Sequence, residues 1–542
     1  MSMLTSITIQ NFKGIGDPVV IPIRSLTIIF GKNSAGKSTL IHALHYAREV
    51  LLNNNPNADK TSLGGSSIDL GGFKNLVHKR EYLDRSIKMR FDLETEPDGF
   101  PEYDEGDIEQ DYLESGLEEF LEGDFGEGLR HIRERRGVNL CAAMVDLKSS
   151  NPTATFDLSV ELEITWSESL AEPIVSSYKT WICGEPAARI TTSPDARDFK
   201  WEVNATHSLS YRQEMQDNAG FDKGSEPMWL GIAHLNRDLK TSRPNWGELI
   251  YLHPDSDLPE FGIGYQTVTQ MMTGPAELLV GYLRSSGLRN LRYIGPLRST
   301  TPRNFQPTSA PDDSLWADGT AAWSKLYDGD VAAEVSEALV GLKTGYALEL
   351  QRYREIPIDS DLMIALQSDT ILDRIEDCAA EVARFPIRQR LMIVEESTGL
   401  RLASHDIGVG ISQVVPVVVA AVHSTNYFVA IEQPELHLHP AVQAELGDLF
   451  IGGIHNAKNN TFFLETHSEH LILRVLRRIR ETEEGEHALG SSRFLKPGDV
   501  SLLFVEPGED GAKYLSIPIT PEGDLEKNVP GGFFAERAEE LF

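Results

Sequence analysis

The chain has 542 residues, of which 41% are hydrophobic and 24% are charged, as in an ordinary globular protein. This length exceeds what one simple hydrophobic core holds, so two or three lobes are expected. The formal net charge of −32 argues against a protein that binds nucleic acid with its whole surface, but it is compatible with a local basic groove. The sequence shows no basic, apolar leader and no run of about 18 apolar residues, so a cytoplasmic location is expected.

The three cysteines, Cys141, Cys183 and Cys378, lie far apart and form no Cys-x-x-Cys pair. Neither a disulfide framework nor a structural zinc site is therefore expected. Buried, unreactive thiols are the simplest interpretation.

A phosphate-binding motif follows the first predicted strands. Branched apolar residues predict strands at 7–14, 19–23 and 25–30, and the pattern of 40–47 predicts a helix. Between the last strand and the helix stands Gly31-Lys32-Asn33-Ser34-Ala35-Gly36-Lys37-Ser38-Thr39, which has the form G-x-x-x-x-G-K-[ST]. The protein is therefore expected to bind a nucleoside triphosphate.

Each residue type in this motif has a physical role. Gly31 and Gly36 allow a tight turn that points backbone N–H groups and the positive end of the helix at the phosphates. Lys37 is expected to reach the β- and γ-phosphates, and the Ser38 hydroxyl to coordinate Mg²⁺. The expected nucleotide contacts in the loop are Gly31, Asn33, Ser34, Ala35, Gly36, Lys37, Ser38 and Thr39.

The order of these elements resembles the start of a known group of ATPases. A strand with Asn11-Phe12-Lys13-Gly14, a second strand and then the Gly31–Thr39 loop is similar to the opening of ABC-type ATPases of the SMC, RecF and overcoming-lysogenization-defect group. The resemblance implies an α/β fold: an ABC-type P-loop ATPase head, with a mixed α+β insert between the phosphate-binding loop and the signature segment. Residues 1–80 would form the first half of the head, and 69–78 would link the nucleotide to the neighbouring lobe.

Residues 81–400 are predicted to form the insert. The strongly acidic run at 97–127 is typical of a solvated or disordered segment, with protein docking or DNA mimicry as the alternative. The basic run at 130–136 either contacts phosphates or neutralises the acidic run. Alternation at 155–166 predicts an exposed antiparallel strand, and 331–340 fits an amphipathic helix. No heptad repeat persists, so a long coiled-coil arm of the SMC kind is not expected.

Two further segments in chain order resemble parts of these ATPases. Residues 291–298 predict a strand and a turn that end in Arg298, which would contact either a phosphate or a carboxylate. Residues 401–500 would form the second half of the head, in which 406–416 resembles the signature segment. The resemblance implies that this segment faces the γ-phosphate held by a second copy, so that a dimer sandwiches two ATP molecules. The residues implied in that contact are Gly410, Ser412 and Gln413.

A buried strand at 427–431 leads into Glu432-Gln433-Pro434-Glu435. In this group the residue at Glu432 orders Mg²⁺, and the next is a glutamate that acts as the base; here it is Gln433. An amide cannot accept a proton as a carboxylate does, and general-base help is typically worth about 10²- to 10⁴-fold. Slow hydrolysis is therefore expected. In the alternatives, Glu435 supplies the carboxylate, or Gln433 orients water as a glutamine does in small GTPases.

Histidines follow this motif at two places. His437 and His439 suggest a metal site, but no third or fourth ligand has a suitable spacing, so contact across the dimer is preferred. After a predicted strand at 461–465, the resemblance implies that His467 reaches the γ-phosphate. Three arginines on one face of the next helix are interpreted as solvated or interfacial before DNA contact is considered; they are Arg474, Arg477 and Arg478.

Residues 501–542 predict two final strands and a short tail. Residues 502–510 are faintly similar to the first acidic motif of the Toprim nuclease domain that relatives in the overcoming-lysogenization-defect family carry. The later Asp-x-Asp pair that this domain needs for Mg²⁺ is missing, so no fused nuclease is expected.

Together these features resemble the ATPase subunit of Septu-type anti-phage systems, some of them retron-associated, whose partner is an HNH nuclease. The resemblance implies a cytoplasmic regulatory ATPase that uses ATP and Mg²⁺, forms a homodimer or higher oligomer, controls a separate nuclease subunit and has no membrane partner. Two alternatives stay open: a RecF-like ATPase of DNA repair, and a scaffold that binds ATP without hydrolysing it. Nucleic-acid binding is also open.

Overall fold

The computed structural model describes residues 3–95, 155–204, 229–231, 290–366 and 382–526, apart from short gaps. The gaps are residues 33–34, 60, 62, 66, 81–83, 301, 303–304, 309–311 and 456–457, and residues 207 and 227 are described singly. Several predicted features lie outside the described residues: the acidic run 97–127, the basic run 130–136, Cys141, Cys378 and the tail 531–542.

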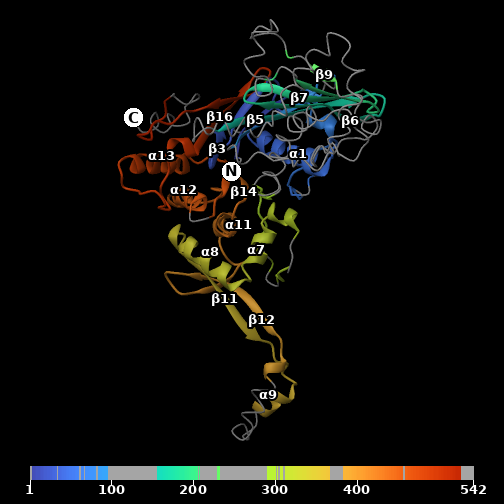
Figure 1. The fold of residues 1–542 in the computed structure, drawn as a ribbon. Coiled ribbons are helices and arrows are strands. Elements are labelled where there is room, and N and C mark those ends of the chain that lie inside the picture. The colour runs from blue at the N-terminus through green and yellow to red at the C-terminus, as the bar shows by residue number, and fades with distance from the viewer. Residues whose placement is uncertain are drawn as a thin grey trace, which may run out of the picture.

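A six-stranded sheet with the order β10-β14-β15-β3-β16-β17 forms the centre of the head (Figure 1). Neighbouring strands are parallel from β10 to β16, and β17 pairs with β16 in the antiparallel sense. The strands are β3 (Leu26–Gly31), β10 (Leu291–Ile294), β14 (Phe428–Glu432), β15 (Thr461–Glu465), β16 (Val500–Gly508) and β17 (Gly511–Ser516). β3, β14 and β15 match the strands predicted at 25–30, 427–431 and 461–465.

Both faces of this sheet are covered, so β3 is buried along its whole length. Leu26, Ile28 and Phe30 face the core built with the C-terminal helices, whereas Ile29 faces the core built around α1. This alternation follows from the two-residue period of a strand. The helices are α1 (Ser38–Asn53), α2 (Phe73–Leu76), α7 (Thr320–Lys325), α8 (Gly329–Gly341), α9 (Asp361–Leu366), α11 (Val409–His423), α12 (Pro440–Ile454) and α13 (Glu469–Glu483).

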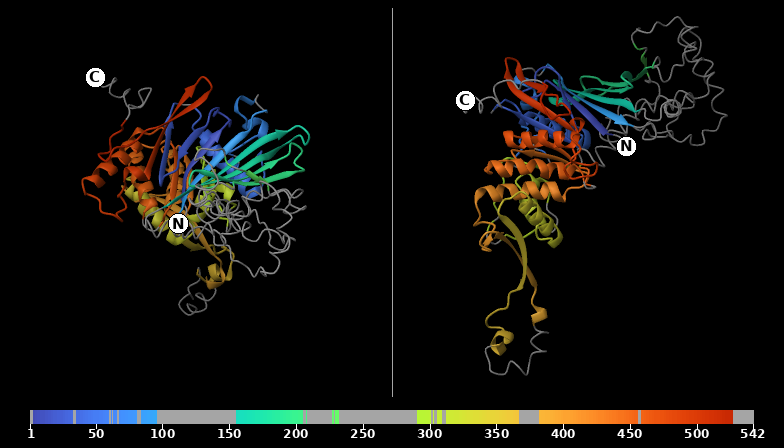
Figure 2. Two further views of the ribbon diagram at one scale, coloured as in Figure 1. Left: turned by 45° about the horizontal axis from the view of Figure 1, so that its top comes forward. Right: turned by 90° about the vertical axis from the view of Figure 1, so that its left-hand side faces the viewer.

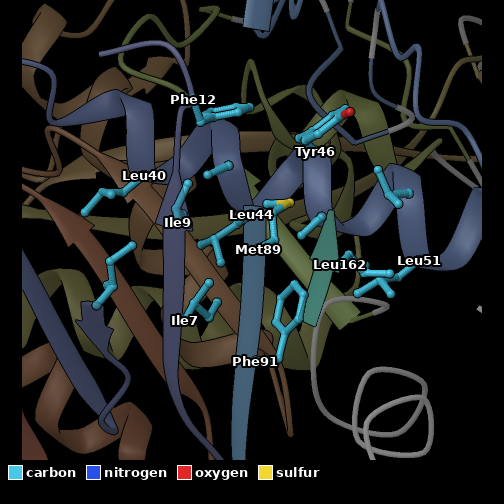
Figure 3. Packing of buried hydrophobic residues seen from close by; sticks show 14 of the residues in the cluster. Ile7, Ile9, Phe12, Leu40, Leu44, Tyr46, Leu51, Met89, Phe91 and Leu162 are labelled. Atoms are coloured by element: carbon cyan, nitrogen blue, oxygen red, sulfur yellow. The ribbon is translucent and has the colours of Figure 1, made fainter. Parts of the chain in front are cut away.

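A second, antiparallel sheet of eight strands packs on the other side of α1. Figure 3 shows α1 lying on it, with Leu44 beside Met89 and Phe91. The strand order in this eight-stranded sheet is β2-β1-β4-β5-β6-β7-β8-β9. The strands are β1 (Met3–Gln10), β2 (Val19–Pro22), β4 (Ile87–Thr95), β5 (Phe156–Ser167), β6 (Glu172–Ile182), β7 (Glu185–Thr192), β8 (Phe199–Asn204) and β9 (Trp229–Gly231).

The expected divisions of the chain at residues 80, 400 and 500 do not coincide with the edges of these sheets. β4 pairs with β1 and β5 pairs with β4, so one sheet continues across residue 80. β10 comes from the expected insert, yet it pairs with β14 in the central sheet. β16 pairs with β3 and therefore also belongs to the head. Strand pairing joins segments that lie far apart in the sequence, and composition alone does not show this.

A β-hairpin arm projects from the head on the side of the C-terminal helices (Figures 1 and 2). It consists of β11 (Tyr346–Arg354) and β12 (Ile387–Glu395), with the short β13 (Arg401–Ala403) beside β12 and α9 near the far end. Among the described residues, this projection is built mainly from the two strands of the hairpin. No helix in the described part of the chain is both long and apolar enough to span a membrane.

Candidate active site

The phosphate-binding loop packs against the hairpin of β16 and β17. A Cβ atom at Gly31, whose φ is +141°, would lie 2.1 Å from the carbonyl oxygen of Val505, so a larger residue would force the strands apart. Gly36 also has a positive φ, of +99°, and its carbonyl oxygen accepts a hydrogen bond from the Tyr514 hydroxyl at 2.8 Å. The predicted contact residues Asn33 and Ser34 lie outside the described residues.

Lys37, Ser38 and Thr39 form the junction between the loop and α1. The Lys37 ammonium group is buried and donates to the carbonyl oxygens of Gly31 and Lys32, at 3.2 and 2.8 Å. Burial lowers the pKa of Lys37, and the nearby Glu465 carboxylate partly opposes that shift. Ala35 and Thr39 are buried, whereas Ser38 starts the helix with its hydroxyl directed at two carboxylates.

Those two carboxylates belong to Glu432 and Glu465, the last residues of two adjacent parallel strands, which are paired in register. The Ser38 Oγ lies 2.8 Å from Glu465 Oε2 and 3.3 Å from Glu432 Oε2. The hydroxyl of Tyr293, on β10, donates to the other oxygen of Glu432 at 2.8 Å. A hydroxyl and two carboxylates form a hard oxygen donor set, which suits Mg²⁺.

The carboxyl groups of the site are harder to ionise than ordinary ones. Burial raises the pKa of Glu432 and of Glu435. Burial, together with the charge of Glu432, raises the pKa of Glu465 to about 7. Like charges held in a low-dielectric place disfavour one another's ionised forms. A bound cation would reverse these shifts.

Gln433 follows Glu432 in a left-handed backbone conformation, with φ of +47°. Its N–H donates to the carbonyl oxygen of Glu465 at 2.7 Å, which fixes it between the ends of β14 and β15. Gln433 is half-buried, next to the carboxylate of the expected metal site. Its side chain can hydrogen-bond to a water molecule, but it cannot take a proton from it.

Arg298 contacts neither of the groups expected from the sequence. It is buried, and its guanidinium group donates to the carbonyl oxygens of Glu432 and Gln433 at 2.6 and 3.0 Å and of Gln413 at 3.2 Å. The Gln413 side chain in turn bonds to the backbone N–H and carbonyl of Arg298. Arg298 therefore ties the start of α11 to the end of β14.

The signature segment starts α11, but its serine is placed differently from the expectation. The N-cap is Gly408, and the exposed residues at the helix start are Gly408 and Val409. The Ser412 hydroxyl is buried and donates to the Val409 carbonyl oxygen at 2.8 Å, because Ser412 lies one turn inside the helix. Gly410 packs closely on the His437 carbonyl, since a Cβ atom there would lie 2.7 Å from that oxygen.

His467 and Glu435 lie together between β15 and α13. The backbone N–H of His467 donates to Glu435 Oε1 at 2.6 Å, and Ser468 caps the helix. Burial and the positive charge of Lys37 lower the pKa of His467, so the imidazole is neutral at pH 7. The contact makes Glu435 a positioning group for the His467 backbone.

The two histidines after β14 do not form a metal site with other side chains. His439 caps α12 by accepting the Ala441 N–H at its Nδ1. No group of three or more His, Cys, Asp or Glu side chains in the described ranges is arranged to hold a metal. The expected contact of His437 and His439 across a dimer stays a prediction.

A cavity of about 590 Å³ adjoins the first turns of α1. Lys13 lines it, and its Nζ lies 2.8 Å from Nδ1 of His42 on α1. Several residues of the predicted linking segment 69–78 also line it, namely Asp69, Leu70, Gly71, Asn75 and Val77. The segment that the sequence placed near the nucleotide therefore lies beside the loop-bearing helix.

Sequence reasoning missed Glu465 and Tyr293 as members of the site. The apolar runs before Glu432 and Glu465 have similar lengths and both end in glutamate, which was a usable signal for two parallel strands ending at the same edge. Tyr293 carried no such signal, because only the pairing of β10 with β14 brings its hydroxyl to Glu432.

A family model described as an AAA ATPase domain matches residues 3–136 and 344–472. The matched segments make up slightly less than half of the chain. The matched segments contain the loop with Lys37 and Ser38, the helix start at Gly408, and the strand ends with Glu432 and Glu465. The chain has the α/β fold of an ABC-type P-loop ATPase, as the sequence predicted. An ATPase of this kind acts on a nucleotide and usually needs Mg²⁺.

Solved structures with similar chain tracing include SMC head domains. One is the SMC head domain from Thermotoga maritima, with 10% identity, a TM-score of 0.33, and 95% of this chain and 99% of that chain covered. Another is the Smc head domain with an extended coiled coil bound to the C-terminal domain of ScpA, from Pyrococcus furiosus, with 10% identity, a TM-score of 0.34, and 100% and 98% covered. These scores lie below 0.5, so the two structures add nothing to the similarity shown by the domain match. A search of curated proteins found no significant match.

Proposed function

We propose that this protein is an ABC-type ATPase that binds ATP tightly, hydrolyses it slowly and works as a dimer with ATP at the interface. One observation supports the proposal: Lys37 and Ser38 of the phosphate-binding loop lie beside Glu432 at the end of β14, and the residue after Glu432 is an amide, Gln433. General-base help is typically worth about 10²- to 10⁴-fold. Turnover well below the common lower value of about 1 s⁻¹ is therefore expected.

The residues have separate tasks in this proposal. Lys37 leaves the carbonyls of Gly31 and Lys32 and binds the β- and γ-phosphate oxygens. Ser38 and Glu432 would hold Mg²⁺, which neutralises phosphate charge when bound. Gln433 orients the attacking water.

Two other side chains would support the site indirectly, by fixing the backbones of Gln433 and His467. Arg298 fixes the Gln433 backbone, and Glu435 fixes the backbone of His467, whose neutral ring would donate a hydrogen bond to the γ-phosphate. The exposed N–H groups at the start of α11 would contact the γ-phosphate held by the second copy, together with the backbone around Gly410. Because the Ser412 hydroxyl is buried and bonded to Val409, we assign this contact to the backbone.

We further propose that the ATPase is the cytoplasmic regulatory subunit of a prokaryotic anti-phage complex and controls a separate HNH-type nuclease. The support is the resemblance of the ordered motifs to Septu-type ATPase subunits, together with Gln433, which favours a long-lived ATP state over rapid turnover. A switch needs a lasting bound state more than it needs a high rate.

The two proposals have different tests. Binding of a fluorescent ATP analogue and single-turnover hydrolysis test the ATPase; tight binding with slow hydrolysis is expected, and fast turnover would contradict it. Copurification with the product of a neighbouring nuclease reading frame, with and without ATP, tests the regulatory role. Turnover stimulated by gapped or ended DNA would instead support a RecF-like repair ATPase. Turnover equal to that of a Lys37→Ala variant would support a non-hydrolysing scaffold.

A further inference from the structure

Glu465 has no place in the usual description of such a site, yet it lies at its centre. β14 and β15 are adjacent and parallel, and their final residues, Glu432 and Glu465, are partners in register. Both carboxylates therefore emerge at the same sheet edge, where the P-loop helix begins with Ser38. The geometry of the sheet places the second carboxylate as close to Ser38 as the first.

The three oxygens are spaced like ligands of a small cation. Mg²⁺ binds its ligands octahedrally at about 2.0–2.1 Å, which puts neighbouring ligand oxygens about 3 Å apart. The Ser38 Oγ is 2.8 Å from Glu465 Oε2 and 3.3 Å from Glu432 Oε2. The other oxygen of Glu432 is bonded to the Tyr293 hydroxyl, which turns Oε2 toward Ser38.

The charges of this group are not neutralised by the protein. Glu432 is 7% exposed and Glu465 is 4% exposed, and neither forms an ion pair with another described residue. The neighbouring cations Lys37 and Arg298 give their hydrogen bonds to backbone carbonyls. Two buried carboxylates that share one hydroxyl donor are costly unless a cation joins them.

We propose that Glu465 is a direct ligand of the divalent cation, so that two carboxylates and the Ser38 hydroxyl hold the metal. This inference rests on the proposed ATPase function and deepens it. Because Gln433 stands in place of a glutamate, the site lacks a carboxylate that could act on the attacking water. Glu465 adds a carboxylate to the site, but this carboxylate binds the metal. A site with two carboxylates binds a divalent cation even before the nucleotide arrives, whereas Glu432 and Ser38 alone would leave most of the ligation to water and phosphate.

The test is a Mn²⁺ titration of the full chain without nucleotide, followed by the loss of the electron paramagnetic resonance signal of free Mn²⁺. The wild-type protein is expected to bind one Mn²⁺ per chain, and Glu465→Gln to weaken this binding at least tenfold. Glu202→Gln is the matched control, because Glu202 is a buried carboxylate in the other sheet, paired with Arg189. Its Mn²⁺ affinity is expected to equal that of the wild type.

Equal Mn²⁺ affinity in Glu465→Gln and wild type would overturn the inference, as would no Mn²⁺ binding by the wild type. If Glu465→Gln does not fold, Glu465→Asp replaces it: its shorter carboxylate is expected to give reduced affinity, and unchanged affinity would overturn the inference. Binding of a fluorescent ATP analogue in EDTA separates the two proposals. If Glu465→Gln keeps its binding of the ATP analogue but loses its binding of Mn²⁺, both the inference and the proposed function are supported. Wild-type protein that binds no ATP analogue contradicts the proposed function itself.

Discussion

Two clusters of charged residues lie in the same head, and they differ in whether their charges are paired among the described residues. Between α12 and α13, Arg474 and Arg478 are paired with acidic side chains. At the ends of β14 and β15, Glu432 and Glu465 have no ion-pair partner among the described residues. The pKa shifts follow this difference, since the pKa values of Glu445 and Glu481 are lowered and those of Glu432 and Glu465 are raised.

The helix cluster is complete in itself. Arg478 makes a two-pronged contact with Asp448, at 2.6 and 2.7 Å, and also contacts Glu481. Arg474 contacts Asp448 at 2.6 Å and Glu445 at 3.0 Å. These arginines were predicted to be solvated or interfacial, and the structure places Arg474 and Arg478 in ion pairs within the chain. Charged side chains that form ion pairs within the chain stabilise the fold. Carboxylates that have no such partner are candidates for binding a cation.

The largest expected effect is that of Lys37→Ala, which removes the cation of the phosphate-binding loop. ATP affinity is expected to fall about 10²-fold, because charge-assisted bonds to phosphate are each worth about 1.5–3 kcal/mol. Equilibrium binding of a fluorescent ATP analogue measures this. Lys343→Ala is the control, since Lys343 pairs with Glu445 in the helix cluster, and its ATP affinity is expected to match the wild type.

Arg298→Met should have the next largest effect, on rate and not on affinity. Without the guanidinium group the Glu432 and Gln433 carbonyls lose their donor, and misplacement of about 1 Å at a site costs up to about 10²-fold in rate. The single-turnover rate is expected to fall about tenfold or more. ATP affinity should change less than about twofold, which equilibrium binding checks.

Two matched variants sharpen this prediction. Arg298→Lys should not rescue the rate, because an ammonium group cannot reproduce the planar fork. Arg474→Met removes an arginine of the helix cluster, and its rate should equal that of the wild type. A loss of ATP affinity as large as the loss of rate in Arg298→Met would show that Arg298 has only a structural role.

The smallest expected effect concerns acid stability of the helix cluster. Arg474 and Lys343 lower the pKa of Glu445 to about 2, and Arg478, Arg477 and His487 lower that of Glu481 to about 2. A carboxyl pKa below its unfolded value of about 4.3 stabilises the fold above that pH, and the stabilisation is lost as pH falls from about 4.3 toward 2. Arg474→Met should therefore flatten the fall of the melting temperature in this range.

Thermal melting between pH 6 and pH 3 tests this prediction. Arg480→Met is the control on the same helix. Arg480 is about half exposed, and its ion pair with Asp524 is long, at 3.8 Å. It should keep the wild-type pH dependence. An unchanged acid slope in Arg474→Met would mean that the helix cluster contributes no measurable stability.

The fold and half of the site could be predicted because their signals are local. The phosphate-binding loop, the strand before it and the strand end at Glu432 are short patterns in which each residue type has a physical reason. The cofactor residues Lys37 and Ser38 follow from the same local pattern. Which strands pair and which side chains meet depends on the tertiary structure, and a local sequence pattern does not predict it.

The parts that were not predicted depend on register and on helix boundaries. Glu465 joins the site because β15 pairs with β14 in register, and Arg298 bonds to carbonyls because α11 and β14 pack side by side. Ser412 was expected to face the γ-phosphate held by a second copy, but α11 begins at Val409, and the serine is buried one turn later. Sequence distance does not reveal these relations.

The most direct test of the account is the rate of ATP hydrolysis in a Gln433→Glu variant, measured under single-turnover conditions beside the wild type. The glutamate supplies a proton acceptor at the end of β14, so the rate is expected to rise about 10²-fold, at the lower end of general-base contributions. ATP affinity is expected to stay within about twofold. An unchanged rate in the variant, or a wild-type rate already near about 1 s⁻¹, would contradict the claim that Gln433 makes this an ATPase built to hold its nucleotide.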